Sequence, residues 1–136
     1  MGLTARQGDR VSSVGVGPSV RHGRGVFATR PIRAGELIEE APVVVMPPDE
    51  IADLKKTVMT EYCFLWGEDE HAAAVMLSVC SLCNHSYLPN ATFDRRFAAG
   101  TIAFLALRDI AAGEEITINY NGDPASRGRL WFRVRP

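Results

Sequence analysis

Three short stretches of the chain carry residue types that suit ligand binding and group transfer. In Gly23-Arg24-Gly25, the paired glycines let the backbone approach a ligand closely. In Asn84-His85, each side chain offers both a donor and an acceptor to a ligand edge. Tyr120 ends a strand-like run, where its hydroxyl can donate and accept a hydrogen bond. The sequence shows no Ser/His/Asp set and no paired carboxylates that would compete with a site built from these stretches.

Each stretch taken alone also fits a purely structural role. Gly23-Arg24-Gly25 fits a turn between strands, and it is no dinucleotide fingerprint because a third glycine and a following helix are missing. His85 fits a buried imidazole paired with backbone groups, and Tyr120 fits a tyrosine packed on a sheet. Asn90 is expected to stabilise its loop by bonds to the backbone, and Glu114-Glu115 to carry turn and strand-face charges.

The order of three motifs favours the functional interpretation. Gly23-Arg24-Gly25-Val26-Phe27 comes first, then Asn84-His85-Ser86-Tyr87-Leu88-Pro89-Asn90, and then Gly113-Glu114-Glu115-Ile116-Thr117-Ile118-Asn119-Tyr120. This set resembles the motifs of the SET-domain lysine methyltransferases, which have a glycine pair before V-F, then N-H-S-x-x-P-N, then G-E-E-I/L-T-x-x-Y. The resemblance covers roughly residues 11–122.

The resemblance implies a cofactor, S-adenosyl-L-methionine, and assigns residues to it. The main chain of Gly23, Arg24 and Gly25 is expected to hold its amino and carboxylate ends, and Asn84 with the His85 backbone its adenine and methionine portions. Tyr120 is expected to align a substrate lysine for in-line methyl transfer. That lysine must arrive neutral, and a desolvated channel beside the positive sulfonium disfavours its ammonium form.

Two further aromatic positions are candidates by the same resemblance. Tyr62 lies in Tyr62-Cys63-Phe64, which is similar to the family's Y-x-F segment, and either walls the lysine channel or belongs to the core. Trp131 and Phe132 follow Tyr120, and the family often has an aromatic residue after the tyrosine that stacks on adenine or closes the channel. Eleven positions separate Tyr120 from Trp131, and the stretch between them contains Pro124 and two glycines. A free tail is the alternative for this pair.

Composition indicates one globular domain and gives no sign of a membrane or secretion segment. The chain has 136 residues, 46% of them hydrophobic, and a net charge of −1, so no overall attraction to nucleic acid or anionic membrane is expected. No apolar run approaches the ~18 residues of a membrane helix, and the N-terminus has no apolar region of a signal peptide. The expected location is cytoplasmic, or nuclear or nucleoid if the substrate is chromatin. The expected partner is a protein or peptide lysine substrate, and a homodimer that completes the site is left open.

The cysteines are expected to hold no metal. Cys80-Ser81-Leu82-Cys83 has C-x-x-C spacing, but no second pair supplies the four ligands of a structural zinc. Cys63, Cys80 and Cys83 are therefore expected to be reduced, buried thiols that act as small hydrophobes. Many SET proteins carry a cysteine-rich zinc segment after the tyrosine, and none is expected here because no cysteine follows Cys83 in the sequence.

The positioning elements are expected to be many short strands with little helix. The pattern predicts a mostly β, β-rich α+β domain, and the resemblance makes it a SET or β-clip-like fold of several small sheets with a C-terminal pseudoknot. Pro42 is expected to break one strand run from the next, Asp49 to cap a short helix, and residues 72–80 to form the best helix. The strands are expected within residues 11–20, 26–29, 36–40, 43–46, 62–66, 101–107 and 115–120.

One segment of the sequence is repeated. Residues 28–38 match residues 106–116 at seven of eleven positions, and both contain an Ala-Gly-Glu turn between strand-like runs. This predicts two similar hairpin-like units. The expected division of the chain is a flexible N-terminus over 1–10, the catalytic domain over 11–122 and a short tail over 123–136. Lysine methyl transfer is the favoured function, and a non-catalytic SET-fold or β-clip module that binds a peptide or small ligand is the alternative.

Overall fold

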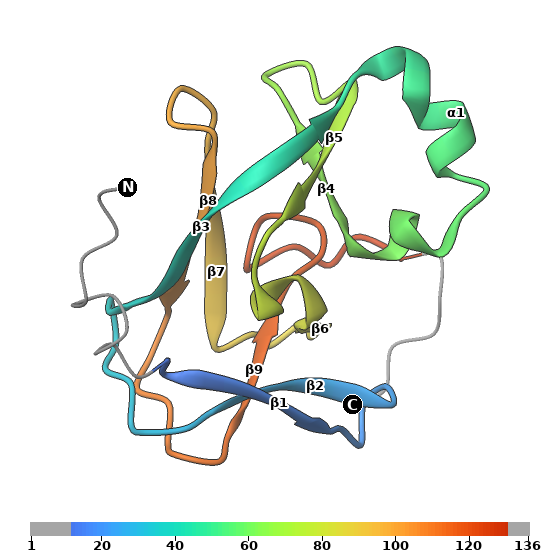
Figure 1. Cartoon of the computed structure of the whole chain (residues 1–136). Helices are drawn as coiled ribbons and strands as arrows, with labels where there is room; N and C mark the ends of the chain where they lie inside the picture. Colours follow the sequence, from blue (N-terminus) through green and yellow to red (C-terminus); the bar gives the residue numbers. More distant parts are fainter. Residues whose placement is uncertain (1–11, 131–136) are drawn as a thin grey trace, which may run out of the picture.

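The computed structural model describes residues 12–130 as two antiparallel-rich sheets packed around one core (Figure 1). One sheet has four strands in the order β1-β2-β9-β6, and the other has five in the order β4-β5-β3-β8-β7. The predicted β-rich class is confirmed. The strands are β1 Val14–Pro18, β2 Arg24–Ala28, β3 Leu37–Met46, β4 Cys63–Trp66, β5 Ala72–Met76, β6 Asn84–His85, β7 Ala91–Arg96, β8 Thr101–Ala106 and β9 Glu115–Ile118.

Helical structure in the described residues is confined to short turns. The α-helix α1 has four residues, Ile51–Leu54, and the 3-10 turns are η2 Pro48–Glu50, η3 Val58–Tyr62 and η4 Val79–Leu82. Asp49 lies inside η2, and no side chain caps α1, so the predicted Asp49 cap is wrong. None of these helices is long and apolar enough to cross a membrane.

The helix expected over 72–80 is also wrong. Ala72–Met76 forms the strand β5, which pairs with β4 on one side and with β3 on the other. Two ladders of backbone hydrogen bonds outweigh the weak helix preference of alanine. The small side chains suit this central position, since Ala73 and Ala74 are buried.

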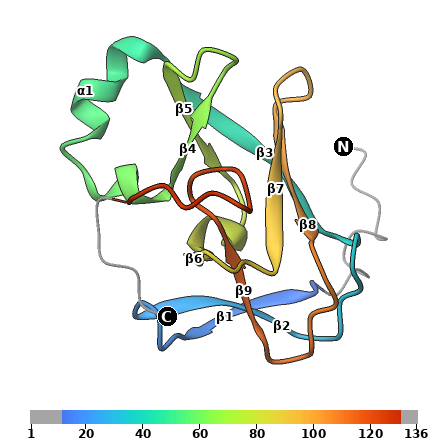
Figure 2. The same ribbon diagram turned by 180° about the vertical axis from the view of Figure 1, so that it is seen from behind.

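Pro42 does not break the strand as expected. Leu37–Met46 is one strand, β3, whose first half pairs with β8 and whose second half pairs with β5. Pro42 sits where the pairing passes from one partner to the other, and a residue without an N–H is tolerated at such a changeover. Because β3 belongs to both ladders, it joins the β7-β8 and β4-β5 hairpins into one sheet (Figure 2).

The repeated segment forms a two-fold-like clasp that packs against itself. Ile32 and Ile110, 78 positions apart, pair through backbone hydrogen bonds in both directions. Arg30 binds Glu36 at 2.5 Å in one unit, and Arg108 binds Glu114 at 2.6 Å in the other. The two units are similar, as predicted, but they are not hairpins, because the strands that flank each turn, β2 and β3 in one unit and β8 and β9 in the other, lie in different sheets. The clasp joins the start of β3 to the start of β9.

The clasp places β9 in the centre of the molecule. β9 lies antiparallel to β2 and parallel to β6, so residues from opposite ends of the chain become neighbours. This is the strand order that the predicted pseudoknot requires, and the threading itself stays a prediction. The core around β9 contains Val26, Ile32, Met76, Ile102, Phe104, Ile110, Ile116 and Ile118.

Candidate active site

The end of β9 and the segment before β6 bring Tyr120 to a cavity. Tyr120 lies two residues beyond β9, and its hydroxyl donates to the Cys83 carbonyl oxygen at 2.6 Å. Its backbone N–H donates to His85 Nδ1 at 3.0 Å. The aromatic ring and hydroxyl are therefore held by the segment that carries the Asn84-His85 motif, although 35 residues separate Tyr120 from His85 in the sequence.

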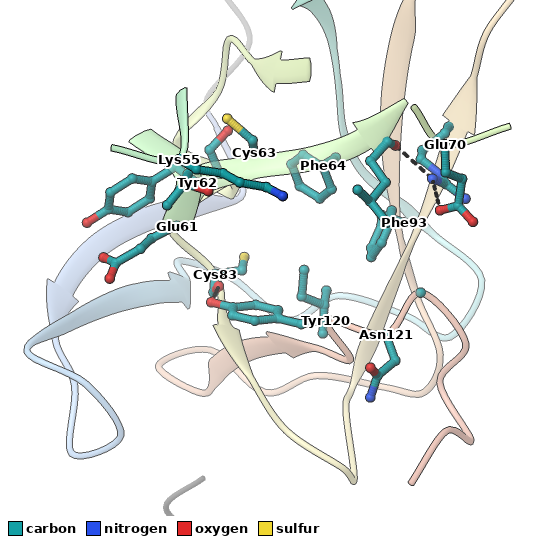
Figure 3. Close-up of a pocket in the computed structure, with 16 residues that line it drawn as sticks. Lys55, Glu61, Tyr62, Cys63, Phe64, Glu70, Cys83, Phe93, Tyr120 and Asn121 are labelled. Atoms are coloured by element: carbon teal, nitrogen blue, oxygen red, sulfur yellow. Dashed lines mark hydrogen bonds and ion pairs between the residues drawn. The ribbon is translucent and has the colours of Figure 1, made fainter. Parts of the chain in front are cut away.

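The cavity beside Tyr120 has a volume of about 630 Å³ and is lined by both predicted tyrosines (Figure 3). Tyr62 enters from the end of η3, and Tyr120 enters from the end of β9. Phe64, Phe93 and Ile118 supply apolar walls between them. Tyr62 thus lines the cavity, which favours the channel-wall alternative over a core position.

The Tyr120 phenol stays protonated in this setting. Burial raises the pKa of Tyr120 above its ordinary value, and the neighbouring Cys83 and Tyr62 raise it further. A neutral phenol is a hydrogen-bond donor and acceptor, so Tyr120 is suited to orienting an amine rather than to removing its proton.

His85 is buried beneath the two tyrosines that flank it. Its ring packs edge-on against Tyr87 and Tyr120, with centroids 4.5 Å and 5.3 Å away. Nδ1 accepts from the Tyr120 backbone, so the neutral ring carries its proton on Nε2, which has no hydrogen-bond partner in the described part of the chain. Burial lowers the pKa of His85, and the charge of Arg21 lowers it further.

The glycine stretch and Asn84 meet at a second point, where β2 and β6 flank β9. Asn84 Nδ2 donates to the Arg24 carbonyl oxygen at 3.0 Å, to Glu115 Oε2 at 2.7 Å and to Ser19 Oγ at 3.3 Å. Gly23 has a φ of +49°, in the left-handed region that favours glycine. Gly25 is closely covered, because a Cβ there would overlap Glu115 Oε2 and lie 2.9 Å from Asn84 Nδ2, so both side chains would have to shift.

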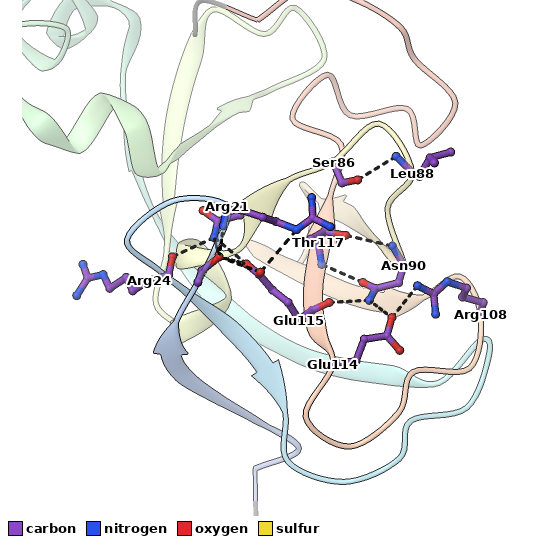
Figure 4. Close-up of polar contacts among 11 residues, drawn as sticks. Arg21, Arg24, Ser86, Leu88, Asn90, Arg108, Glu114, Glu115 and Thr117 are labelled. Carbon is purple, nitrogen blue, oxygen red and sulfur yellow. Dashed lines mark hydrogen bonds and ion pairs between the residues drawn. The ribbon is translucent and has the colours of Figure 1, made fainter. Parts of the chain in front are cut away.

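Glu115 contacts the predicted cofactor residue Asn84, a position that the sequence interpretation missed. It was expected to be a strand-face charge, but its carboxylate accepts from Ser19 and Asn84 and lies 3.6 Å from Arg21 Nε (Figure 4). The sequence does contain a hint of this contact. Glu115 is a charged residue directly before the run Ile116–Ile118, which is buried, and β2, the strand beside it, contains a glycine.

Asn90 performs the stabilising role that was predicted for it. Its Nδ2 donates to the Glu115 carbonyl oxygen at 2.7 Å and to Glu114 Oε2 at 3.0 Å, and its Oδ1 accepts from the Thr117 N–H at 2.9 Å (Figure 4). These bonds fasten the loop after β6 along β9. Glu114 therefore serves the clasp and the loop together.

The groups present fit the ligand that the motifs imply. Nδ2 of Asn84 is fully engaged, while its Oδ1 receives no hydrogen bond from the residues that the structure describes, so an acceptor is left for a ligand amine. His85 Nε2 is an unpaired donor on the next residue. Gly23 leaves open space around its Cα, so the main chain of this turn is accessible.

The structure does not bring every predicted residue to the site. Trp131 and Phe132 lie outside the described residues. Cys80 and Cys83 are free and buried, whereas Cys63 is partly exposed and lines the cavity, so the expectation of three buried thiols is wrong for Cys63. Within residues 12–130 no group of three or more His, Cys, Asp or Glu side chains is arranged to hold a metal ion.

Comparison with known proteins places this geometry in a family. The SET domain family matches residues 23–121. A histone-lysine N-methyltransferase of Schizosaccharomyces pombe, specific for H3 lysine 37, is 36% identical over 113 residues, which cover 82% of this chain and 71% of that protein.

Solved structures agree with the sequence comparison. The crystal structure of a candidate histone methyltransferase from Plasmodium falciparum superposes with a TM-score of 0.66 at 25% identity, covering 91% of this chain and 100% of the other. The ctPRC2 complex bound to S-adenosylmethionine also gives a TM-score of 0.66 at 25% identity, over 85% of this chain and 16% of that one. The chain therefore belongs to the SET-domain family of protein lysine methyltransferases, enzymes that take their methyl group from S-adenosylmethionine.

Proposed function

We propose that this chain methylates the side chain of a protein lysine that enters the cavity between Tyr62 and Tyr120. The observation that carries the proposal is the double attachment of Tyr120, through its hydroxyl to the Cys83 carbonyl and through its backbone N–H to His85. Such a tyrosine is fixed in position at the cavity wall, and in-line methyl transfer depends on alignment of the reacting atoms.

The residues divide into two groups with separate tasks. Gly23, Arg24, Asn84 and His85 would hold S-adenosylmethionine, which supplies an electrophilic methyl group on a sulfonium. Tyr120 and the Cys83 carbonyl would orient the amine, and the apolar walls of Phe64 and Phe93 would favour the neutral amine over the ammonium ion. No general base is required at the cavity, because the proton leaves the amine for water before it enters.

Histone H3 is the first substrate to test. The curated relative is a methyltransferase specific for H3 lysine 37, and the P. falciparum structure is a candidate histone methyltransferase. Action on chromatin would place the chain in the nucleus. The net charge of −1 gives no reason to expect direct binding to DNA.

Two measurements test the proposal. Calorimetry with S-adenosylhomocysteine should give a defined 1:1 binding curve, and histone H3 incubated with the protein and S-adenosylmethionine should gain 14 Da increments, about the mass of one added CH₂ each. A protein array would then identify substrates other than H3. Binding of S-adenosylhomocysteine without methylation of any array protein would favour the non-catalytic binding module instead.

A further inference from the structure

We propose that Lys55 is a self-methylation site, a lysine of this chain that reaches its own catalytic cavity; the inference rests on the function proposed above. Lys55 ends the helix α1 as its C-cap residue, and it lines the same cavity as Tyr62 and Tyr120. Figure 3 shows its side chain extending toward Phe64, with the amine at the end.

The two lysines of the chain differ in surroundings, although they are adjacent. The sequence contains thirteen arginines but only Lys55 and Lys56. Lys56 forms an ion pair with Asp53 at 3.2 Å and does not line the cavity. No carboxylate of residues 12–130 lies within ion-pair distance of the Lys55 amine, so no salt bridge holds it outside.

The position of Lys55 on the cavity suits an incoming substrate amine. Lys55 lines the cavity from the end of α1, and Tyr120, which is bonded to the Cys83 carbonyl, lines it from the end of β9. Asn84 and His85, the groups assigned to the methyl donor, directly follow Cys83 in the sequence and do not line the cavity themselves. An amine entering beside Tyr120 and a methyl donor held next to Cys83 would meet at Tyr120, where alignment favours an in-line displacement. Because Lys55 is part of the chain, its effective concentration at the cavity exceeds that of a dilute external substrate.

The reaction balances with the methyl donor alone. The Lys55 Nζ lone pair forms a bond to the methyl carbon while the bond between that carbon and the sulfonium sulfur breaks. One proton passes from Nζ to water, and the products are N-methyl-Lys55 and S-adenosylhomocysteine. Methylation keeps the positive charge of the amine, so the expected consequence is a change in how Lys55 competes with substrate lysines rather than a change in net charge.

The first test follows transfer itself. The protein would be incubated with S-adenosylmethionine carrying a CD₃ group, which separates new methyl groups from any added during expression, and digested for mass spectrometry. We expect the heavy methyl on Lys55, with Lys56 at least tenfold less labelled. Lys56→Arg should keep the label on Lys55, Lys55→Arg should lose it, and Tyr120→Phe should slow it.

A second test reads the position of Lys55 without methyl transfer. The protein would be acetylated with a water-soluble amine reagent, with and without saturating S-adenosylhomocysteine. If the Lys55 amine enters the cavity, S-adenosylhomocysteine bound at Asn84 and His85 should change the acetylation rate of Lys55 at least threefold relative to that of Lys56. The Lys56 rate serves as the internal control for the reagent.

The outcomes separate the two proposals. Self-methylation within one chain is supported if the fraction of chains that gain a heavy methyl on Lys55 per minute is independent of protein concentration over a tenfold range. Three outcomes would overturn the Lys55 inference and leave the proposed function standing. They are a labelled fraction per minute that rises in proportion to protein concentration, label on Lys56 instead, and an unlabelled Lys55 in a protein that binds S-adenosylhomocysteine and methylates another protein. Failure to bind S-adenosylhomocysteine would remove the proposed function and the inference together.

Discussion

Asn84 donates its side-chain amide to the Glu115 carboxylate at 2.7 Å, across 31 positions of sequence. This bond determines which way the Asn84 amide faces, because Nδ2 is turned to Glu115, Ser19 and the Arg24 carbonyl, and Oδ1 is left for a ligand. It also explains Gly25, whose Cα face is covered by the same carboxylate. Glu115 is thus a positioning residue for the site at which we expect the methyl donor.

Removing the Glu115 carboxylate should weaken cofactor binding. Glu115→Ala deletes an acceptor of Asn84 and of Ser19, and a lost hydrogen bond to a charged group costs about 1.5–3 kcal/mol. We expect the Kd for S-adenosylhomocysteine, measured by calorimetry, to rise at least about tenfold. Glu115→Gln retains one acceptor oxygen and should recover part of the affinity.

Glu36→Ala is the control for Glu115→Ala, because Glu36 is a clasp carboxylate that contacts neither Asn84 nor the glycine stretch. Parent affinity in Glu115→Ala, in a protein that stays folded, would show that the carboxylate does not position the site.

A side chain at Gly25 should disturb the same bond. Gly25→Ala would place a Cβ against Glu115 Oε2 and Asn84 Nδ2, so both side chains must move. Overpacking of this kind costs about 1–3 kcal/mol, and we expect a matching fall in unfolding free energy together with weaker S-adenosylhomocysteine binding. Gly15→Ala on β1 is the control, since its Cβ would meet only Thr29 Cγ2 at 3.5 Å. Equal behaviour of the two variants would contradict this account.

Tyr120→Phe should separate alignment from folding. The change removes the hydroxyl that contacts the Cys83 carbonyl and keeps the ring against His85. We expect the methylation rate to fall at least about a hundredfold while S-adenosylhomocysteine binding stays near normal, because misalignment acts on the transfer step. Loss of the buried hydrogen bond should cost about 1–3 kcal/mol of unfolding free energy.

Tyr87→Phe is the matched control for Tyr120→Phe. The Tyr87 hydroxyl also donates to a carbonyl, that of Gly128 at 2.8 Å, and its ring also packs on His85, but it does not line the cavity. A parent methylation rate in Tyr120→Phe, or an equal loss in Tyr87→Phe, would mean that Tyr120 has no special role.

The raised pKa of Tyr120 predicts the alkaline limb of the pH profile. Because the phenol pKa lies above its ordinary value, the hydroxyl stays protonated up to and beyond about pH 10. The rate of methylation should therefore show no decline from ionisation of Tyr120 between pH 7 and about pH 10. A decline in that range that disappears in Tyr120→Phe would contradict the assignment.

The clasp should make stability sensitive to acid. Hydrogen bonds from Arg108, which contributes most, and from Asn90 and the Ala111 N–H together lower the pKa of Glu114 from 4.5 to about 2. A carboxylate with a depressed pKa stabilises the fold above its unfolded pKa, and that contribution disappears as the pH falls from about 5 to about 2. Melting temperature should fall over this window, and less steeply in Glu114→Gln.

The repeat offers the control for Glu114. Glu36 occupies the equivalent position, and its pKa is also lowered by an arginine, but it lacks a partner equivalent to Asn90. Glu36→Gln should therefore change the acid dependence less than Glu114→Gln. At neutral pH the Glu114 variant should lose about 1 kcal/mol, the size of a mostly exposed ion pair. The reverse order would show that Asn90 adds nothing to the clasp.

Local sequence was sufficient for the features that depend on residue type and short spacing. The Ala-Gly-Glu turns of the repeat appear where they were expected, because Gly35 and Gly113 both take positive φ and each glutamate binds the arginine six positions before it. Asn90 bonded to the backbone as its residue type and loop predicted. Four of the nine strands in residues 12–130, β1, β4, β8 and β9, lie within the predicted ranges, and β2 and β3 overlap them.

Other features depended on which segments became neighbours in space. Ala72–Met76 is a strand because β3 and β4 flank it, and alanine has no local preference strong enough to resist them. Pro42 is accommodated because the two partners of β3 meet at that residue. Neither pairing is visible in a window of adjacent residues.

The site divides in the same way. The motifs alone were sufficient to select Gly23, Asn84 and Tyr120 as candidate site residues, because the chemical properties that suit them to a site follow from residue type. The surroundings of Glu115 and Lys55 were decided only by the tertiary structure, which turns the Glu115 carboxylate onto Asn84 and places Lys55 in the lining of the cavity. A charged side chain has the same composition on a free surface as in a site, and only its partners, brought from distant parts of the chain, distinguish the two.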